Sequence, residues 1–550
     1  MSKSNAILIV GAGPTGLSLA NDLARRKVPF KIIDSKSGPS SDSKGLAINI
    51  SSQYGLRLIG VAPAPGGNGM PISRLNLYWN SARFSAIDFS YLPTGITSLI
   101  TQPQAITERE LIQSLEATGN RVHWGCKLTE LTEAHSSVTA SYLTANGNLI
   151  EENFSFLIGC DGKHSKVRAQ LNAAFEGKTY PMHFVLGDFD VEPGLADTQV
   201  HYFVYEDTFF IFVPIAKGTW RIVVKYDGPL PQTPPSAYDI SQVIARHFGN
   251  QLTLGDPLWI SRAPFYNRVA GHLNSKRLFI AGDAAHLFSP IGGTGMNTGI
   301  QDALNLGWKL AAVYHNLSHE SLLASYTQER LPAIREAANL SDLSTQLITR
   351  QLVNHPVLDK LVPRQCNRQF FRQAAPWLHS GLAQRVPLRT ALCTTMPVTE
   401  TRLGQFSQEL FYLLDRQSLA DLTTDKRVSF WCFISASSLI TPILEIDALQ
   451  MLRSLLLKQY QCNIIYCVDS LDCELPFVLS AREAISDMVL PAGAINTWQQ
   501  VTLVRPDGLI FYESRLNALD HVQTAIDQNF HFLSTILNST TGEAIYEEAI

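Results

Sequence analysis

Several features that would indicate other classes of protein are missing from this sequence of 550 residues. Its eight cysteines include no Cys-x-x-Cys pair, so neither a dithiol redox centre nor a cysteine-based metal site is indicated. Scattered free thiols are the usual state of cysteine in a reducing compartment. A cytoplasmic location and no bound metal are therefore expected.

Long apolar runs and long runs of one charge are also scarce. The apolar stretch 428–444 is interrupted by serines and a proline, and a membrane span needs about 20 predominantly apolar residues. The run 6–10 is too short for the core of a signal peptide. The formal net charge is −4 without a long basic run. We expect no targeting segment, no integral membrane segment and no nucleic-acid partner.

The periodic patterns that are present predict a mixed α/β chain of two or three domains. An apolar run at 6–10, a helical pattern to residue 26 and a second apolar run at 30–34 predict a βαβ unit. Runs of strand type separated by turns fill 180–270 and predict a sheet inserted into the α/β part. A compact α/β series returns after residue 425, with expected strands at 428–435, 462–469 and 499–504 and expected helices at 442–458 and 514–534.

A glycine turn stands between the first strand and the first helix, as Gly11-x-Gly13-x-x-Gly16. In this position Gly11 permits the tight turn, Gly13 lets a pyrophosphate approach the backbone, and Gly16 lets the helix pack on the sheet. The free amides at the helix start stabilise phosphate charge. Asp34 ends the second strand, where a carboxylate can accept hydrogen bonds from an adenosine ribose. This motif predicts a dinucleotide site but leaves FAD and NAD open.

Two further motifs follow at the ends of apolar strands. Asp161-Gly162 precedes a short helical pattern, and Gly282-Asp283 precedes a glycine-rich loop at 290–295 that leads into a long helix. In this order and spacing, the three motifs resemble the class A (single-component) FAD-dependent aromatic monooxygenases over about residues 5–345. The resemblance implies FAD as the cofactor.

The resemblance also implies roles for individual residues. Asp283 would bind a ribityl hydroxyl, Met296 and Asn297 would approach the isoalloxazine ring, and Asp161 is associated with FAD and with the nicotinamide donor. The helix that begins near Gly295 would direct its positive end at the flavin. The complete set of expected cofactor-binding residues is Gly11, Gly13, Pro14, Thr15, Gly16, Asp34, Lys44, Gln104, Leu128, Asp161, Gly282, Asp283, Pro290, Gly293, Gly295, Met296 and Asn297.

Four residues of this region need separate comment. Gln104 matches a position that the family places against FAD, and Leu128 one that contacts the adenine side through its backbone. Relatives usually carry an arginine where this chain has Lys44, which keeps the charge but loses the bidentate fork. His286 follows the third motif, and we expect it to pack beside the cofactor phosphates and not to act as a catalytic residue.

The resemblance implies an α/β fold class in which a Rossmann-like FAD-binding domain carries an inserted β-sheet substrate domain. The expected boundaries are 1–179 and 271–400 for the FAD-binding domain with a helical connection, 180–270 for the substrate domain, and 401–550 for a C-terminal domain. The last segment resembles the thioredoxin-like domain of phenol and polyketide hydroxylases, most closely at Leu503-Val504-Arg505-Pro506-Asp507-Gly508. Without Cys-x-x-Cys, its expected role is structural or in forming a homodimer.

The activity implied is hydroxylation of a phenolic or polycyclic, polyketide-type aromatic substrate. NADPH or NADH would reduce FAD transiently, and O2 would form a flavin C4a-hydroperoxide that transfers oxygen to the ring. Because the flavin carries this chemistry, no catalytic side chain is assigned. Epoxidation, Baeyer–Villiger oxidation or reduction on the same fold, and a non-catalytic FAD-binding scaffold protein, remain alternatives.

Overall fold

The computed structural model describes most of the chain up to residue 348 and shorter segments beyond it. The described residues are 6–40, 45–61, 69–79, 82–92, 98–192, 195–205, 208–289, 291–316, 318–348, 379–380, 431–436, 463–468, 488–489, 500–507 and 510–515.

A five-stranded parallel sheet forms the centre of the N-terminal α/β part, in the order β19-β12-β1-β2-β8. The strands β1 and β12 are buried along their whole length, as expected of a parallel sheet that is covered on both faces. The predicted βαβ unit is confirmed. The elements are β1 (Ile7–Val10), α1 (Pro14–Arg25), β2 (Phe30–Ile33), β8 (Val122–His123), β12 (Phe156–Gly159) and β19 (Leu278–Ile280).

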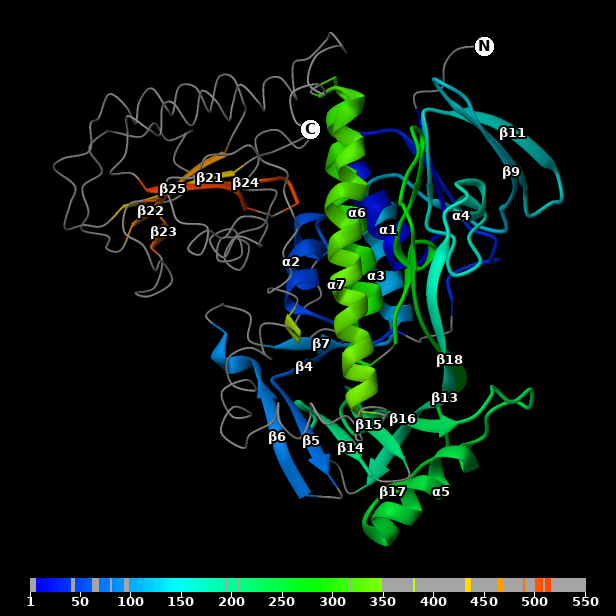
Figure 1. Ribbon diagram of the computed structural model, residues 1–550, viewed down its shortest axis with the longest axis vertical. Helices are drawn as coiled ribbons and strands as arrows, with labels where there is room; N and C mark the ends of the chain where they lie inside the picture. Colours follow the sequence, from blue (N-terminus) through cyan, green and yellow to red (C-terminus); the bar gives the residue numbers. More distant parts are fainter. Residues whose placement is uncertain are drawn as a thin grey trace.

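Helices pack against this sheet and against one another. Figure 1 shows α6 and α7 as two long helices running side by side through the middle of the molecule, with α1 and α3 behind them. The long helix predicted after the glycine-rich loop at 290–295 is confirmed as α6, and the helical pattern of the sequence at 104–119 forms α3. The elements are α2 (Ile50–Leu58), α3 (Gln104–Ala117), α4 (Lys166–Gln170), α6 (Thr294–Tyr314), η4 (Glu320–Ala324) and α7 (Ser325–Ile348).

A nine-stranded sheet lies below the parallel sheet and its helices in Figure 1, in the order β20-β18-β13-β16-β15-β14-β5-β6, with β17 on β13. The predicted β-rich character of 180–270 is confirmed. Strands β5 and β6 join it from residues 74–88, outside the expected boundary, because β5 pairs in parallel with β14. The elements are β5 (Arg74–Trp79), β6 (Ala82–Asp88), β13 (Phe175–Glu192), β14 (Gln199–Val204), β15 (Phe209–Ala216), β16 (Thr219–Asp227), α5 (Ala237–Phe248), β17 (Thr253–Leu254), β18 (Trp259–Ala270) and β20 (His286–Leu287).

Two small three-stranded sheets complete the part of the chain before residue 160. One is the meander β11-β10-β9, and the other has the order β3-β7-β4. Their strands are β3 (Ala47–Ile48), β4 (Met70–Ile72), β7 (Leu99–Thr101), β9 (Lys127–Glu133), β10 (Val138–Leu143) and β11 (Leu149–Phe154).

The C-terminal part contains a five-stranded mixed sheet in the order β23-β22-β21-β24-β25. The three strands predicted there are confirmed. The helix expected at 442–458 and most of 514–534 lie outside the described residues, and β25 continues through Arg515, where that helix was expected to have begun. The strands are β21 (Trp431–Ala436), β22 (Asn463–Val468), β23 (Met488–Val489), β24 (Gln500–Val504) and β25 (Ile510–Arg515).

The turn between β24 and β25 is buried against α6 and α7. The Arg505 guanidinium makes two hydrogen bonds to Glu329, of 3.0 and 2.9 Å, and Asp507 accepts hydrogen bonds from Asn305 and Trp308. Lys309 also pairs with Glu329 at 2.9 Å. A cluster of two cations and two carboxylates therefore joins the C-terminal sheet to α6 and α7.

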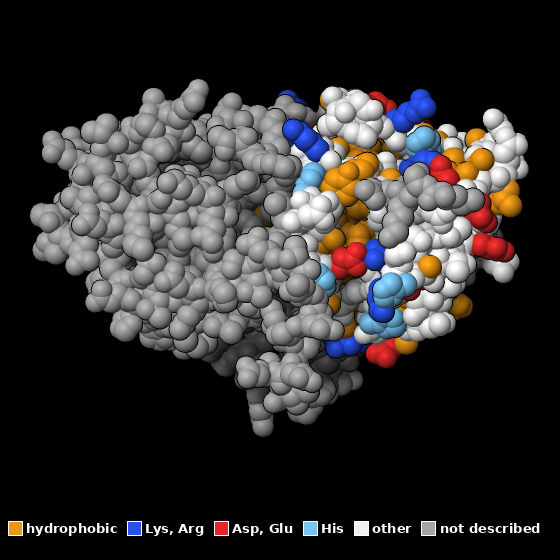
Figure 2. All heavy atoms as spheres, turned by 90° about the horizontal axis from the view of Figure 1, so that it is seen from above, with side chains coloured by type: hydrophobic (Ala, Val, Ile, Leu, Met, Phe, Trp, Pro, Cys, Tyr) orange, Lys and Arg blue, Asp and Glu red, His pale blue; other side chains and the backbone are white. Residues whose placement is uncertain are grey.

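Seen from above, the described part of the surface carries Lys and Arg interspersed with Asp, Glu and hydrophobic side chains (Figure 2). Among the helices of the described residues, none is long and apolar enough to cross a membrane.

Candidate cofactor and substrate site

One cavity of about 740 Å³ extends from the glycine turn to the inner face of the nine-stranded sheet. It gathers residues from all three sequence motifs, which lie far apart along the chain. The expected cofactor-binding residues that line it are Gly11, Gly13, Pro14, Thr15, Asp34, Gln104, Leu128, Asp161, Asp283, Gly293, Gly295 and Met296. The motifs are therefore neighbours in space, and their roles toward FAD stay predictions.

The three glycines of the N-terminal turn occupy different environments. Gly11 has φ +106°, and a Cβ there would lie 2.2 Å from the Cys160 carbonyl oxygen. A Cβ on Gly16 would lie 2.0 Å from the Gly11 oxygen, so this glycine allows α1 to pack closely. Gly13 has nothing within 4 Å of its Cβ position, and it faces the cavity. The turn therefore leaves an open cradle where the sequence predicts the pyrophosphate.

Two helix N-termini border the same cavity without side-chain caps. The N-cap residues are Gly13 for α1 and Gly293 for α6, and neither can offer a capping side chain. At the start of α6, Thr294 Oγ1 is buried without a hydrogen-bond partner among the described residues. Uncapped amides and helix dipoles stabilise negative charge. The cavity therefore fits a cofactor that carries a pyrophosphate and a ring that becomes anionic on reduction.

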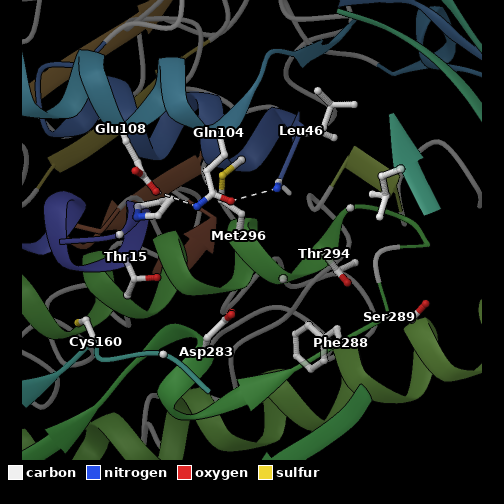
Figure 3. A pocket seen from close by; sticks show the side chains of 18 of the residues that line it. Thr15, Leu46, Gln104, Glu108, Cys160, Asp283, Phe288, Ser289, Thr294 and Met296 are labelled. Carbon is white, nitrogen blue, oxygen red and sulfur yellow. Dashed lines mark hydrogen bonds between the residues drawn. The ribbon is translucent and has the colours of Figure 1, made fainter. Parts of the chain in front are cut away.

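Carboxylate and amide side chains hold the walls of the cofactor end. Asp34 Oδ2 accepts a hydrogen bond of 2.7 Å from the Ala12 amide, which fixes the glycine turn. Gln104 donates to Glu108 at 2.8 Å and accepts from the Gly45 amide at 3.0 Å, as the dashed lines in Figure 3 show. Burial raises the pKa of Glu108, which lines the cavity and was not predicted as a site residue. Only its position one turn after Gln104 could have indicated it.

Five expected residues do not line this cavity or cannot be placed. Lys44 and Pro290 lie outside the described residues. Gly16 and Gly282 pack internally, and Gly282 has φ +62° with its Cβ position 2.4 Å from Thr15 Oγ1. Asn297 donates to the Ala47 oxygen at 2.9 Å and accepts from the Asn49 amide at 3.0 Å. Its side chain therefore ties α6 to the 47–49 segment instead of facing the cavity.

A buried ion network supports the Gly-Asp motif from behind. Asp302 on α6 accepts hydrogen bonds from the Gly282 amide at 3.1 Å and from His286 at 2.8 Å, and it pairs with Arg330 at 2.8 Å. Burial acts to raise the pKa of Asp302, but Arg330 and His286 outweigh it and hold the pKa below its usual value. His286 is fully buried in this network and is not among the lining residues, so the geometry offers no reason to assign it a catalytic role.

The far end of the cavity is mainly apolar. It is formed by alternate side chains of the nine-stranded sheet, including Leu186, Val200 and Ile211. Phe288 and Ser289, which lie below Thr294 in Figure 3, also line the cavity. Polar side chains also line this end, among them Thr101, Tyr202, Arg221, Ser289 and His379. In the sequence, Tyr202 is one of several aromatic residues in the strand patterns of 180–270, and nothing there distinguishes it from the others. Nothing in the sequence indicated Arg221 or His379, because the register of the strands and the surroundings of 379–380 are tertiary properties.

Comparison with known proteins agrees with this geometry. The sequence profile of the FAD binding domain family matches residues 4–341, more than half of the chain. The chain belongs to this family. The match confirms the resemblance carried by the three motifs, and it identifies the cofactor of the site as FAD.

Individual relatives of this FAD-binding chain differ in what they do. It is 32% identical over 342 residues to pentachlorophenol 4-monooxygenase of Sphingobium chlorophenolicum, with 61% of this chain and 63% of that protein covered. It is 31% identical over 336 residues to dialkyldecalin synthase of Streptomyces rugosporus, covering 60% and 69%. The chain therefore matches less than two thirds of the length of the first of these relatives.

The fold as a whole is shared with solved structures. Aklavinone-11 hydroxylase, in a ternary complex with FAD and aklavinone, superposes with a TM-score of 0.69 at 19% identity, covering 98% of this chain and 99% of that one. This similarity confirms the predicted α/β fold class. The thioredoxin-like assignment of the C-terminal part remains a prediction.

Proposed function

We propose that this chain is an FAD-dependent monooxygenase that uses NADPH or NADH and O2 to hydroxylate a phenolic or polycyclic aromatic compound. The observation that carries the proposal is the single cavity, which joins the FAD motifs to the apolar face of the nine-stranded sheet. Because both ends belong to one cavity, FAD at the motifs and an aromatic ring at the sheet would be neighbours. Ligand sites of this kind are concave, mostly apolar and provided with a few polar groups.

The residues of the chain supply binding, orientation and exclusion of water. The amides at the start of α1 would hold the pyrophosphate, and Asp34 would accept from a ribose hydroxyl. The N-terminus of α6 would stabilise negative charge on the reduced ring. When bound and reduced, FAD supplies the activation of O2 and the transfer of oxygen. The apolar lining of the far end keeps water from the reacting groups.

A second candidate is a reaction that needs the FAD-bound fold but no oxygen transfer. It is favoured by one observation, the 31% identity to a dialkyldecalin synthase over 60% of this chain, a share close to the 61% matched by the monooxygenase relative. A fold alone does not fix the reaction.

Turnover measurements separate the two candidates. The purified holoprotein is expected to be yellow, to oxidise NADPH or NADH faster in the presence of a phenolic compound, and to incorporate one atom of 18O from 18O2 into the product. Release of hydrogen peroxide, measured in parallel, distinguishes coupled hydroxylation from simple oxidase activity. Unlabelled product formed without consumption of NAD(P)H would overturn the proposal in favour of the second candidate.

A further inference from the structure

Along the strands of the nine-stranded sheet, successive side chains alternate between the inner face, which lines the cavity, and the outer face. On β14, Val200 and Tyr202 face the cavity, while Phe203 packs into the cluster beneath α5. On β15, Ile211 faces the cavity and Phe212 packs outward in the same way. Successive side chains of a strand point to opposite faces, so the observed register decides which groups a substrate would meet.

Among the described residues, Arg221 on β16 is the cation at this end of the cavity, and its charge is already matched. Its Nε and Nη2 donate to the two carboxylate oxygens of Asp188, at 2.7 and 2.8 Å, while the guanidinium lies 4.5 Å from the ring centre of Trp259. The Arg221 side chain is 1% exposed. A bidentate buried pair of this kind has no net charge to offer to a ligand.

Tyr202 and His379 differ from the other polar groups at this end. Thr101 donates to the Pro214 oxygen, and Ser289 accepts from the Ile291 amide. By contrast, neither Tyr202 nor His379 has a hydrogen-bond partner for its side chain among the described residues.

Both side chains are neutral near pH 7. Burial raises the pKa of Tyr202 to about 12 and lowers that of His379 to about 4. Because both side chains line the cavity, their unpaired polar groups are available to hydrogen bond a bound ligand.

We propose that the sheet end of the cavity selects an uncharged aromatic compound that carries a hydroxyl or carbonyl group, held by Tyr202 and His379, and excludes aromatic carboxylates. The inference rests on the proposed function for the identity of the cavity as a substrate site. Its reason is electrostatic: a carboxylate placed among apolar side chains needs a cation, and Arg221 is neutralised by Asp188. A neutral hydroxyl needs only hydrogen bonds, which the two unpaired groups can make.

Three probes test the charge preference on the holoprotein. They are 2-naphthol, 6-hydroxy-2-naphthoate and the methyl ester of the latter, and their dissociation constants are measured by calorimetry on the oxidised protein. The ester has the added bulk of the carboxylate without its charge. We expect 2-naphthol and the ester to bind within about tenfold of each other, and the carboxylate roughly 100-fold more weakly than the ester. Equal affinities of ester and carboxylate would overturn the inference.

Substitutions test the two hydrogen-bonding groups. Tyr202→Phe and His379→Leu should each weaken 2-naphthol binding by roughly 3- to 10-fold and leave naphthalene binding unchanged. Tyr205→Phe is the matched control, because Tyr205 lies on the same segment but packs against Phe210 and His247 beneath α5. Wild-type affinity of both variants for 2-naphthol would contradict the assignment.

The binding and turnover experiments fail separately. A protein that shows the expected order of affinities but never oxidises NAD(P)H would refute the monooxygenase proposal and support the selectivity of the cavity. A protein that hydroxylates 6-hydroxy-2-naphthoate as efficiently as its ester would support the monooxygenase and refute the selectivity.

Discussion

Gly11 and Gly13 stand two residues apart in one turn, yet they are needed for different reasons. Gly11 has a positive φ and no room for a Cβ, so its requirement is one of folding. Gly13 has an extended backbone, and its Cβ position has no neighbouring atom within 4 Å. A side chain there would therefore fit the fold and would obstruct only a ligand that approaches from the cavity. The motif GxGxxG cannot distinguish these two cases from letters alone.

Gly13→Ala is therefore expected to leave the folded apoprotein intact and to weaken FAD binding. The added methyl group would occupy the cradle and displace at least one charge-assisted hydrogen bond, which lowers affinity on the order of 10- to 100-fold. Fluorescence titration of the apoprotein with FAD measures this, and the thermal midpoint of the apoprotein checks the fold. Gly38→Ala, where a Cβ also meets nothing within 4 Å, is the control and should bind FAD normally. Unchanged FAD affinity in Gly13→Ala would refute the assignment of the cradle.

Asp302 makes the free energy of unfolding depend on pH in the acidic range. Its pKa is depressed in the folded state, so its stabilisation is fully present above the unfolded value of about 4 and is lost as the pH falls through the lower folded value. Asp302→Asn should lower the free energy of unfolding at pH 7 by about 3–5 kcal/mol, because Arg330 and His286 lose a buried partner. Urea unfolding between pH 5 and pH 3 should then show a smaller loss of stability in the variant than in the wild type. Parallel pH profiles would contradict this role of Asp302.

At the scale of elements, the close approach of α6 to the N-terminal turn controls the shape of the cofactor site. A Cβ on Gly299 of α6 would lie 2.3 Å from Thr15 Oγ1 and 3.2 Å from the Gly282 Cα. Gly282 of the Gly-Asp motif and Gly299 of α6 therefore both pack against Thr15, which belongs to the N-terminal glycine turn. Any bulk added there must push α6 away from α1.

Gly299→Ala is expected to destabilise the protein by about 1–3 kcal/mol through overpacking and to weaken FAD retention. Thr15→Ala removes the oxygen that the new methyl group would strike, so the double variant should recover a large part of the loss. Thermal unfolding of the single and double variants gives the coupling between the two positions. Gly295→Ala, which lies on the same helix and meets nothing within 4 Å, serves as the stability control. Additive effects of Gly299→Ala and Thr15→Ala would show that the contact does not limit the packing.

At the scale of the whole molecule, the turn between β24 and β25 joins two parts of the chain that are nearly 200 residues apart. Arg505 and Asp507 meet Glu329 and Lys309, and all four side chains are buried. Burial lowers the pKa of Lys309 to about 8, although Glu329 opposes the shift. When the C-terminal turn is in place, Arg505 and Asp507 bring the cluster to two positive and two negative charges.

Arg505→Met should therefore destabilise the FAD-binding part as well as the C-terminal part. Removing one cation leaves the two carboxylates with Lys309 alone, a loss of about 3–5 kcal/mol for a broken buried pair. Combining it with Glu329→Gln should cost less than the sum of the single changes, by about 0.5–3 kcal/mol. Thermal unfolding followed by flavin fluorescence measures the effect on FAD release. A lower midpoint for the C-terminal part alone would refute the coupling.

The sequence by itself determined the α/β class, the βαβ unit, the main helices and strands, and the FAD family. These follow from local patterns, namely the periodicity of apolar residues and the spacing of Gly11, Gly13 and Gly16 within one strand-to-helix turn. The expected positions of Gly11, Gly13 and Asp34 in a common cavity follow from the same local geometry.

Only the tertiary structure decided which side chains face a substrate and which support the site from behind. Tyr202 and Phe203 are indistinguishable by pattern, because a shift of one residue in strand register exchanges the two faces. The place of His379 at the cavity and that of Asp507 against α6 cannot be predicted from local periodicity, because both are set by tertiary packing. The packing of α6 directs the Asn297 amide to the 47–49 segment, while its expected approach to the flavin ring stays a prediction.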